Sequence, residues 1–290
     1  REGDVSRAGG SATLAFRRGF APEAPSLARP PRVATAHPFR YPDPMDVAAP
    51  DYSIVLPAYN EEALLPATLE RLREAMAEVP LRGEIVVCDN NSSDRTAEVA
   101  AAAGARVVLE PKNQISRARN AGARASRGRF LVFVDADTLV PSPLLREALL
   151  ALASGRACGG GASVEMEGVT TGLAGRMVWL WNGISRGRRL AAGSFVFVLR
   201  EAFEAVGGFS ERVYASEEIW LSRAVKRWGR RRGLPFVILR DHPVVTSGRK
   251  ARWYPAPVIL AVAIALLLCP FLVLSRRFCF VWYRRPARPA

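Results

Sequence analysis

Two carboxylates, Asp135 and Asp137, stand one residue apart directly after an apolar run, Phe130-Leu131-Val132-Phe133-Val134. Such a run is typical of a buried strand, and an open α/β sheet binds its ligands at the carboxyl ends of its strands. Carboxylate oxygens in that position suit Mg2+ or Mn2+, either of which can bridge a diphosphate. An isolated Asp-x-Asp is more often a solvated turn, so the interpretation depends on the rest of the chain.

A second pair of acids, Glu217 and Glu218, opens a predicted helix over residues 216–229. A carboxylate in that place is suited to act as a general base, which takes the proton from an attacking acceptor hydroxyl. A donor whose diphosphate is held by a metal ion needs such a base when a hydroxyl is the nucleophile. The two acidic pairs together therefore predict a group-transfer site, which neither pair predicts alone.

Polar turns also follow two apolar runs upstream. The first turn is Pro57-Ala58-Tyr59-Asn60-Glu61-Glu62, and the second is Asp89-Asn90-Asn91-Ser92-Ser93-Asp94. Strands are predicted near 52–57, 84–88, 106–110 and 129–135, with helices near 61–78, 92–103 and 114–127. This alternation predicts an α/β fold with a mostly parallel sheet and helices on both faces, so that both turns lie at the same sheet edge as the Asp pair.

The alternation is weaker after Asp137. Strands are predicted at 163–167 and 194–199, and a Trp-bearing helix or lid at 171–187. The run Gly159-Gly160-Gly161 is predicted to be a loop in which backbone segments approach closely. We expect acceptor specificity to reside in this half of the chain.

Four motifs in this order resemble the family 2 glycosyltransferases with the GT-A fold, over about residues 51–248. They are the Pro57–Glu62 turn, the Asp89–Asp94 turn, the Asp135-Ala136-Asp137 motif and the Glu217-Glu218 pair. The segment from Gly193 to Phe209 is similar to the acceptor-side segment of that family. The family usually has Glu-Asp where this chain has Glu217-Glu218, so a base at Glu218 requires that one more methylene be tolerated.

The resemblance implies a nucleotide-diphosphate sugar donor, commonly linked to UDP or GDP, a lipid-linked or saccharide acceptor, and inversion at the anomeric carbon. The nucleotide would be bordered by the two upstream turns, through Pro57, Ala58, Tyr59, Glu61, Asp89 and Asn90. Asp135 and Asp137 would hold Mg2+ or Mn2+, with Asp137 the more direct ligand. Glu218 would accept the proton, and Glu217 would orient it or contact the acceptor.

A further polar group, Arg117, Arg119 and Asn120, is expected at the start of the third helix, facing the same sheet edge. Contact with the donor phosphate or sugar and an ordinary surface role both stay open for these residues. His242 is expected to have a structural role before Pro243.

Several classes of site are excluded by missing residues. No Gly-x-Gly-x-x-Gly follows the first strand and no Gly-Lys-Ser/Thr loop is present, which excludes dinucleotide and P-loop sites. The two His and four widely separated Cys of the chain do not form a zinc ligand set. Two alternatives remain: a nucleotidyltransferase of similar fold, although the expected Gly-rich first loop is missing, and a non-catalytic membrane-bound scaffold.

The net charge of +14 is unevenly placed, with nine cations and one acid from Lys226 to Arg252. A solvated helix face is the ordinary explanation of such a cluster. Here the cluster leads into Trp253-Tyr254 and then nineteen uncharged residues, Ala256 to Leu274. As a helix these would span roughly 28 Å, close to the thickness of the hydrocarbon core of a bilayer. A membrane partner is therefore predicted, with Trp-Tyr belts at both ends, and no nucleic acid.

We accordingly predict three parts: a disordered extension over residues 1–50, a GT-A domain over 51–252, and a C-terminal apolar membrane segment and basic tail over 253–290. Residues 1–44 are expected to be an upstream extension that is dispensable for folding and activity, because Met45 stands just before the first strand. The positive-inside rule favours a cell-membrane location with the catalytic domain in the cytoplasm. Pro270 leaves a re-entrant or in-plane hairpin open as the alternative to a spanning helix.

Overall fold

The computed structural model describes residues 49–169, 171–249 and 253–284 of the chain. All of them belong to one unit, Asp43–Ala290. The predictions for the first 48 residues, namely disorder and a dispensable extension, lie outside the described residues.

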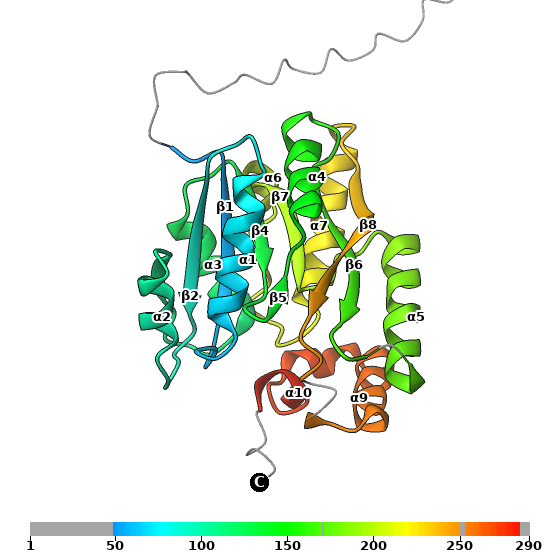
Figure 1. Cartoon of the computed structure of the whole chain (residues 1–290). Coiled ribbons are helices and arrows are strands. Elements are labelled where there is room, and N and C mark those ends of the chain that lie inside the picture. Colours follow the sequence, from blue (N-terminus) through cyan, green and yellow to red (C-terminus); the bar gives the residue numbers. More distant parts are fainter. Residues whose placement is uncertain (1–48, 170, 250–252, 285–290) are drawn as a thin grey trace, which may run out of the picture. The chain divides into compact units, whose positions relative to one another are not determined.

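The first half of the sheet is parallel and follows the predicted alternation closely (Figure 1). Its strands are β1 (Tyr52–Ala58), β2 (Gly83–Asp89), β3 (Arg106–Leu109) and β4 (Phe130–Val134), connected by helices α1 (Leu65–Ala77), α2 (Thr96–Ala102) and α3 (Ile115–Ala125). Helices α1 and α2 begin later than predicted because the turns before them are irregular, with Asn60 and Asn91 in the left-handed region at φ 52° and 65°.

The second half adds antiparallel pairs to the same sheet. Its elements are β5 (Thr138–Leu139), α4 (Ser142–Ala153), β6 (Gly159–Met166), α5 (Gly172–Arg188), β7 (Phe195–Leu199), α6 (Arg200–Ala205), α7 (Glu217–Arg230) and β8 (Phe236–Thr246). Across the described residues the strand order is β3-β2-β1-β4-β7-β6-β8-β5. Strand β7 is antiparallel to both β4 and β6, so the sheet is mixed but mostly parallel.

The glycine run at 159–161 is the beginning of β6, so the prediction of a loop there was wrong. Gly160 pairs with Phe197 on one side and with Val237 on the other. A Cβ atom at Gly160 would lie 2.3 Å from the Val237 carbonyl oxygen and 2.4 Å from Cζ of Phe197. The expected close approach of backbone is therefore present, but it occurs inside the sheet, where only glycine fits.

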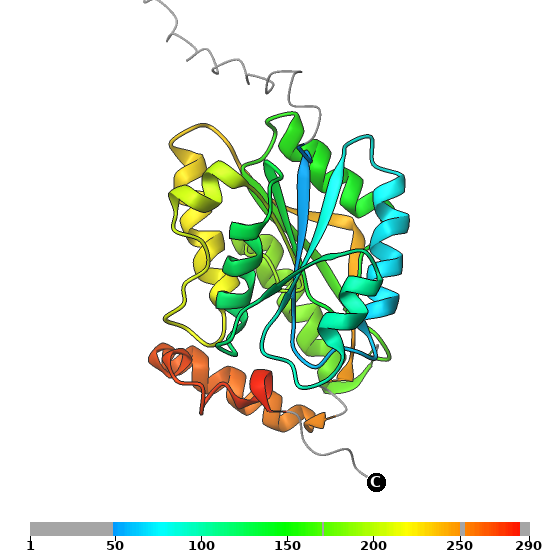
Figure 2. The same cartoon turned by 90° about the vertical axis from the view of Figure 1, so that its left-hand side faces the viewer.

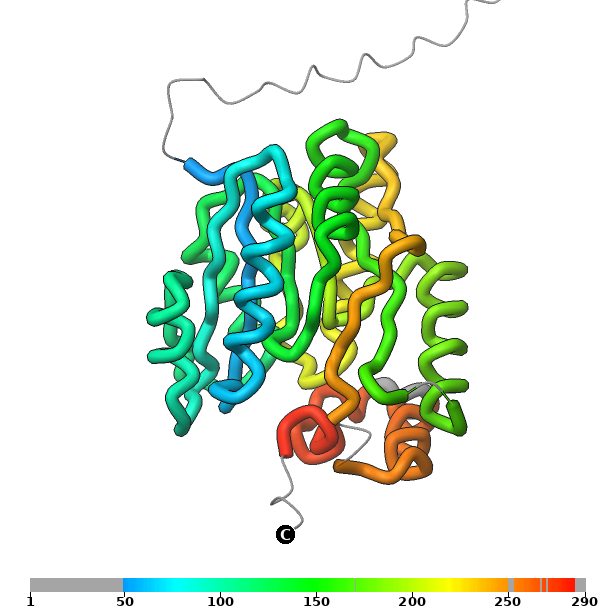
Figure 3. The backbone as a smooth tube through the Cα atoms, viewed as in Figure 1, coloured from blue at the N-terminus to red at the C-terminus, as the bar shows by residue number. Residues whose placement is uncertain are grey.

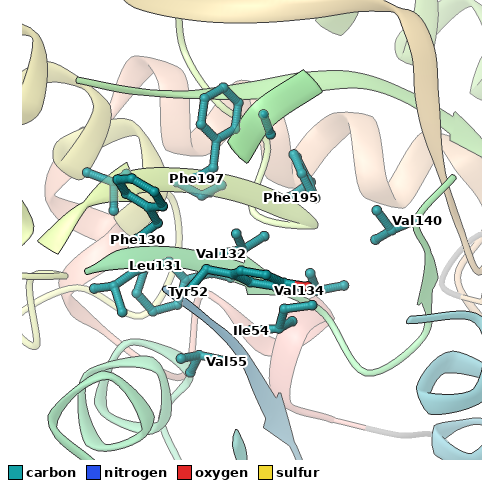
Figure 4. Packing of buried hydrophobic residues seen from close by; sticks show 14 of the residues in the cluster. Tyr52, Ile54, Val55, Phe130, Leu131, Val132, Val134, Val140, Phe195 and Phe197 are labelled. Atoms are coloured by element: carbon teal, nitrogen blue, oxygen red, sulfur yellow. The ribbon is translucent and has the colours of Figure 1, made fainter. Parts of the chain in front are cut away.

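Apolar side chains of β1, β4 and β7 form the centre of the core (Figure 4). The Phe133 ring lies 5.2 Å from the ring of Phe203 and 4.9 Å from that of Phe209, measured between ring centroids. Helices α1 and α4 cover one face of the sheet, and α3, α6 and α7 cover the other (Figure 2). This packing fixes the ends of β1 and β4, which carry the polar turns.

The C-terminal segment forms α9 (Ala256–Leu268), a 3-10 helix η1 (Pro270–Leu274) and α10 (Phe280–Tyr283). Of the two arrangements left open for 256–274, a single spanning helix is not present: α9 ends at Leu268, just before Pro270, which lacks the backbone N–H that would continue it. Among the described residues, no helix is both long and apolar enough to cross a membrane.

This segment folds back beneath the sheet (Figure 3). Val273, Cys279 and Val281 are buried, and the backbone N–H of Tyr214 donates to the Val273 carbonyl oxygen at 2.7 Å. The sequence had offered no obvious core for this segment, yet part of it packs against the residues just before α7. The rest keeps large apolar side chains exposed, with Leu268 at 74% and Phe271 at 65% of full exposure.

Candidate active site

Asp135 and Asp137 lie in the turn directly after β4, as predicted. The turn is fixed by a backbone bond from Thr138 N–H to the Asp135 carbonyl oxygen (3.1 Å) and by the Thr68 hydroxyl, which donates to the Ala136 carbonyl oxygen (2.9 Å). Ala136, between them, is buried. Each carboxylate pairs with a different arginine.

Arg119 is the partner of Asp135. One of its nitrogens, Nη1, donates to Glu217 at 2.7 Å, and Nη2 donates to Asp135 and to the Gly193 carbonyl oxygen, both at 2.8 Å. The side chain is only 2% exposed. The two neighbouring carboxylates hold the pKa of Arg119 above its usual range despite its burial. Arg119 thus joins the two acidic motifs, which are far apart in the sequence.

Arg249 makes the second pair from the end of β8. Its Nη1 donates to Glu61 Oε2 at 2.7 Å, and its Nη2 donates to Glu61 Oε1. Nη2 also lies 3.1 Å from Asp137 Oδ2. The guanidinium is stacked over the Trp253 ring at 5.3 Å. Hydrogen bonding to Glu61 and the charge of Asp137 hold the pKa of Arg249 above its usual range. Sequence reasoning missed this residue.

A small cavity of about 100 Å3 lies over the ends of β1, β2 and β4. Of the predicted nucleotide-side residues, six line it together with Asp137: Pro57, Ala58, Tyr59, Glu61, Asn90 and Asp135. Its other walls are Ile115, Arg249 and three aromatic side chains of the C-terminal segment, namely Trp253, Trp282 and Tyr283. The Tyr283 hydroxyl accepts a bond from Ile115 N–H at 3.4 Å. The family resemblance, which ends near residue 248, did not predict these three aromatic residues.

Not every predicted residue reaches this cavity. Asp89 instead accepts a bond from Ser92 N–H at 3.1 Å and so braces the second polar turn. Asn120 is buried and bonds to the Phe209 backbone and to Glu211. Arg117 pairs with Glu110 and Glu211. Asn120 and Arg117 therefore do not line this cavity, and a contact between them and the donor stays a prediction.

A larger cavity of about 330 Å3 begins at the same two aspartates and extends between α5 and α9. Arg119, Glu217 and Glu218 line its inner end. Most of the remaining wall is apolar: Val164, Met166, Met177, Val178, Trp181, Ile259, Val262, Val281 and Trp282. Asp135 and Asp137 thus lie where the smaller cavity, with its mixed lining, adjoins the mostly apolar larger one.

The acidic pair stands at the start of α7, after Ser216 in the left-handed region at φ 62°. Glu217 is buried and paired with Arg119, whereas Glu218 is half-buried and lines the larger cavity. Burial and the charge of Glu217 raise the pKa of Glu218 to about 8. Gly193 lies against both groups: a Cβ there would be 3.1 Å from Arg119 Nη2 and 3.8 Å from the Glu218 carboxyl carbon.

Comparison with known proteins identifies the family and the fold of the chain. Residues 53–204 match the model of Glycosyl transferase family 2. Over 85 residues the chain is 42% identical to an uncharacterized glycosyltransferase of Mycobacterium bovis, a match covering 29% of this chain and 36% of that relative. It is 38% identical over 107 residues to the undecaprenyl-phosphate 4-deoxy-4-formamido-L-arabinose transferase of Pseudomonas aeruginosa. This match covers 34% of this chain and 30% of that relative. These matches span about a third of the length of the curated relatives.

A solved structure shares the fold. The mannosyltransferase PcManGT from Pyrobaculum calidifontis, in complex with GDP-Man and Mn2+, aligns with a TM-score of 0.54 at 18% identity, covering 80% of this chain and 85% of that chain. The fold is thus of the mixed α/β, GT-A-like kind that the motifs predicted. Since the family model covers more than half of the 290 residues, the chain belongs to glycosyl transferase family 2.

Proposed function

We propose that the chain is an inverting glycosyltransferase that moves a sugar from a nucleotide-diphosphate donor to a lipid-linked acceptor at the cytoplasmic face of the cell membrane. The observation that carries this proposal is the position of Asp135 and Asp137 between two unlike cavities. The smaller is bordered by the two polar turns of the family motif and suits the nucleotide. The larger contains the acidic pair and suits the acceptor. Membership of family 2 favours sugar transfer over nucleotidyl transfer.

The lining of the larger cavity favours a lipid-linked acceptor over a free saccharide. Met, Val and Ile side chains cannot hydrogen-bond to sugar hydroxyls, whereas burial of a hydrocarbon chain among them is favourable by about 25 cal/mol per Å2 of apolar area. The Pseudomonas aeruginosa relative is named for undecaprenyl phosphate, a lipid of this kind. We expect labelled sugar from a UDP- or GDP-linked donor to appear in the organic phase when polyprenyl phosphate or a lipid-linked saccharide is supplied. Transfer only to a soluble saccharide would refute this acceptor class.

The carboxylates at the end of β4 fit a divalent ion in their chemistry. Asp135 and Asp137 offer hard oxygen ligands, as Mg2+ and Mn2+ require. The described residues contain no cluster of three or more His, Cys, Asp or Glu that could hold a metal by themselves. The remaining ligands would therefore have to come from the donor diphosphate and water. Such an ion would neutralise charge on the leaving diphosphate.

The remaining chemistry is assigned to side chains of this chain. Glu218 takes the proton from an acceptor hydroxyl, because it lines the larger cavity beside the aspartates. Glu217 is held by Arg119 and so fixes the start of α7, which positions its neighbour. Arg249 lines the smaller cavity, and its guanidinium would bind a diphosphate by exchanging its present partners, Glu61 and Asp137, for phosphate oxygens.

Replacing Asp137 with Asn tests the metal assignment. We expect the variant to keep its fold, because Arg249 retains Glu61 as a partner, but to lose metal-dependent donor binding and several kcal/mol of transition-state stabilisation. The measurement is the thermal shift produced by UDP- and GDP-linked donors with Mn2+, together with the transfer rate. Asp241→Asn, at an exposed position of β8, is the matched control. Full activity of the Asp137 variant with Mn2+ would remove Asp137 from the metal site.

Membrane attachment is proposed to reside in the C-terminal segment. Leu268, Phe271 and Leu274 are 54–74% exposed, and Cys269 and Pro270 turn the chain before α9 is long enough to span a bilayer. An in-plane arrangement, with these side chains entering the interface, agrees with such a short helix.

A chain truncated after Arg252 tests this attachment. We expect it to remain folded and to be released from the membrane fraction by high salt. It should also bind donor more weakly than the full chain, because it lacks Trp253, Trp282 and Tyr283 of the smaller cavity. The full chain should stay with membranes through a high-salt wash, since salt screens the arginines and leaves the apolar contacts. Sedimentation and circular dichroism provide the readout. Release of the full chain by salt would show that its attachment is only electrostatic.

A further inference from the structure

A groove of about 700 Å3 lies between the C-terminal end of α5, the outer side of α7 and the start of β8. We call it the basic groove. Six of its eleven lining residues are cations: Arg188, Arg189, Arg223, Lys226, Arg227 and Arg230. None of its lining residues belongs to the two cavities at the aspartates. The basic groove is therefore a separate feature that the proposed reaction does not use.

The cations of the basic groove are not neutralised by acids. Among the described residues, no ion pair involves any of the six. Lys226 Nζ donates to the Arg188 carbonyl oxygen at 2.6 Å, which draws α7 and the end of α5 together. Partial burial and then the charges of neighbouring arginines, Arg223 first among them, lower the pKa of Lys226. Mutual repulsion of this kind is relieved when an anion binds.

An apolar stripe on α5 leads into the basic groove. Leu173, Leu180 and Ile184 are 39%, 55% and 42% exposed, and their spacing of seven and four residues places them on one side of the helix. Gly187 continues this line and is itself part of the groove wall. Two tryptophans accompany the stripe, Trp179 on α5 at 74% exposure and Trp220 on α7 at 49%. Cations, exposed apolar side chains and tryptophans in this order are typical of a surface that binds a membrane interface.

The same helix borders the apolar cavity. Other side chains of α5, including Met177 and Val178, wall the larger cavity opposite Ile259 and Val262 of α9. Figure 1 shows α5 beside β6 and α9 below the ends of the strands, near the lower end of α5. A bilayer in contact with α5 would therefore lie beside the cavity that we assign to the lipid-linked acceptor.

We propose that the basic groove and the α5 stripe form a docking surface for an anionic lipid bilayer, with phosphate headgroups in the groove and the stripe in the interfacial layer. This surface is distinct from the C-terminal segment and extends the membrane placement proposed above. It rests on the proposed function only for the identity of the acceptor. Charge complementarity selects the occupant: six cations without acids match a layer of phosphates, and the apolar stripe beside them matches the acyl boundary.

The test uses the full chain and vesicles of phosphatidylcholine with and without phosphatidylglycerol. The triple variant Arg223→Gln, Arg227→Gln, Arg230→Gln is compared with Arg71→Gln, Arg73→Gln, Arg106→Gln, which removes the same charge from exposed positions of α1 and β3. We expect the groove variant to bind phosphatidylglycerol vesicles roughly tenfold to 100-fold more weakly than wild type, and the control variant to change little. Equal binding by the two variants would overturn the proposal.

Three further measurements separate the remaining explanations. Leu180→Ser with Ile184→Ser should weaken binding to both kinds of vesicle, and an unchanged affinity would remove the stripe from the surface. If inorganic tripolyphosphate binding depends on the three arginines while vesicle binding does not, the groove is a site for soluble anions and the proposal fails. The thermal shift with donor and Mn2+ should be the same in the groove variant and wild type. A failure of the docking surface is thereby distinguished from a failure of the proposed sugar transfer.

Discussion

Replacing Glu218 with Gln should lower turnover by roughly 100- to 10,000-fold with an acceptor that attacks through a hydroxyl, while donor affinity stays near that of wild type. Glutamine keeps the shape of the side chain but cannot take the proton. Glu218 lines the larger cavity together with Asp135 and Asp137. Its loss should therefore affect the chemical step rather than the binding of the nucleotide at the two polar turns. The measurements are the transfer rate under saturating donor and the donor dissociation constant. Glu201→Gln, at an exposed position of α6, is the control.

The same variant identifies the nucleophile. A polyprenyl phosphate attacks through an oxygen that is already anionic and needs no proton removed, so the Glu218 variant should transfer to it at nearly the wild-type rate. A hydroxyl acceptor that reacts equally fast with the variant would contradict the role of Glu218 as the base.

The pH dependence should report the same group. The base works only when deprotonated, and the pKa of Glu218 is raised from 4.5 to about 8 by burial and by Glu217. The ratio kcat/KM for a hydroxyl acceptor should therefore rise with pH well above the range in which a glutamate ordinarily titrates. Glu217→Gln removes a negative neighbour and should move this rise to lower pH.

Replacing Arg119 with Met should lower the free energy of unfolding by about 3–5 kcal/mol, the usual cost of leaving a buried charge without its partner. Arg119 is almost fully buried and compensates both Asp135 and Glu217 at 2.7–2.8 Å. It also holds the Gly193 carbonyl oxygen and stacks on Phe209 at 5.1 Å, so methionine would replace its volume but not its contacts. Urea unfolding of the two proteins measures the difference.

Arg71→Gln is the matched control for this stability change. Arg71 pairs with Glu74 at 2.7 Å, but both side chains are more than half exposed, and such surface pairs contribute little. A loss in the Arg119 variant no larger than that in the control would show that the buried network does not stabilise the fold.

The strands and carboxylates of the first half could be predicted because their signals are local. Apolar runs mark β1, β2 and β4, and parallel strands place the residues after them at one edge. Arg249 could not be found in this way, because its partner Glu61 is 188 positions away in the sequence. Nothing near either residue signals a pair that exists only when β8 passes beside β6 and β5.

The later elements show a different limit. In the strand β8 the apolar run is interrupted by Arg240, Asp241 and Pro243, although the strand pairs along β6 across an irregularity between Ala162 and Val164. In α9 the apolar run was read correctly as a helix, but its length depended on Pro270 rather than on hydrophobicity. Sequence periodicity thus identified helices and strands better than it identified where they end or what they contact.

The smaller cavity takes its walls from both β1 and α10. It can therefore be completed only after both parts of the chain have been made. During synthesis the N-terminal part of a protein leaves the ribosome first and begins to fold first. The sheet edge with Tyr59 and Asp137 can form at that stage, but Trp282 and Tyr283 are still inside the ribosome. A nascent chain therefore lacks the C-terminal walls of the smaller cavity, which we assign to the nucleotide, until the segment that we assign to the membrane has emerged. Activity would begin only on chains already able to reach their membrane.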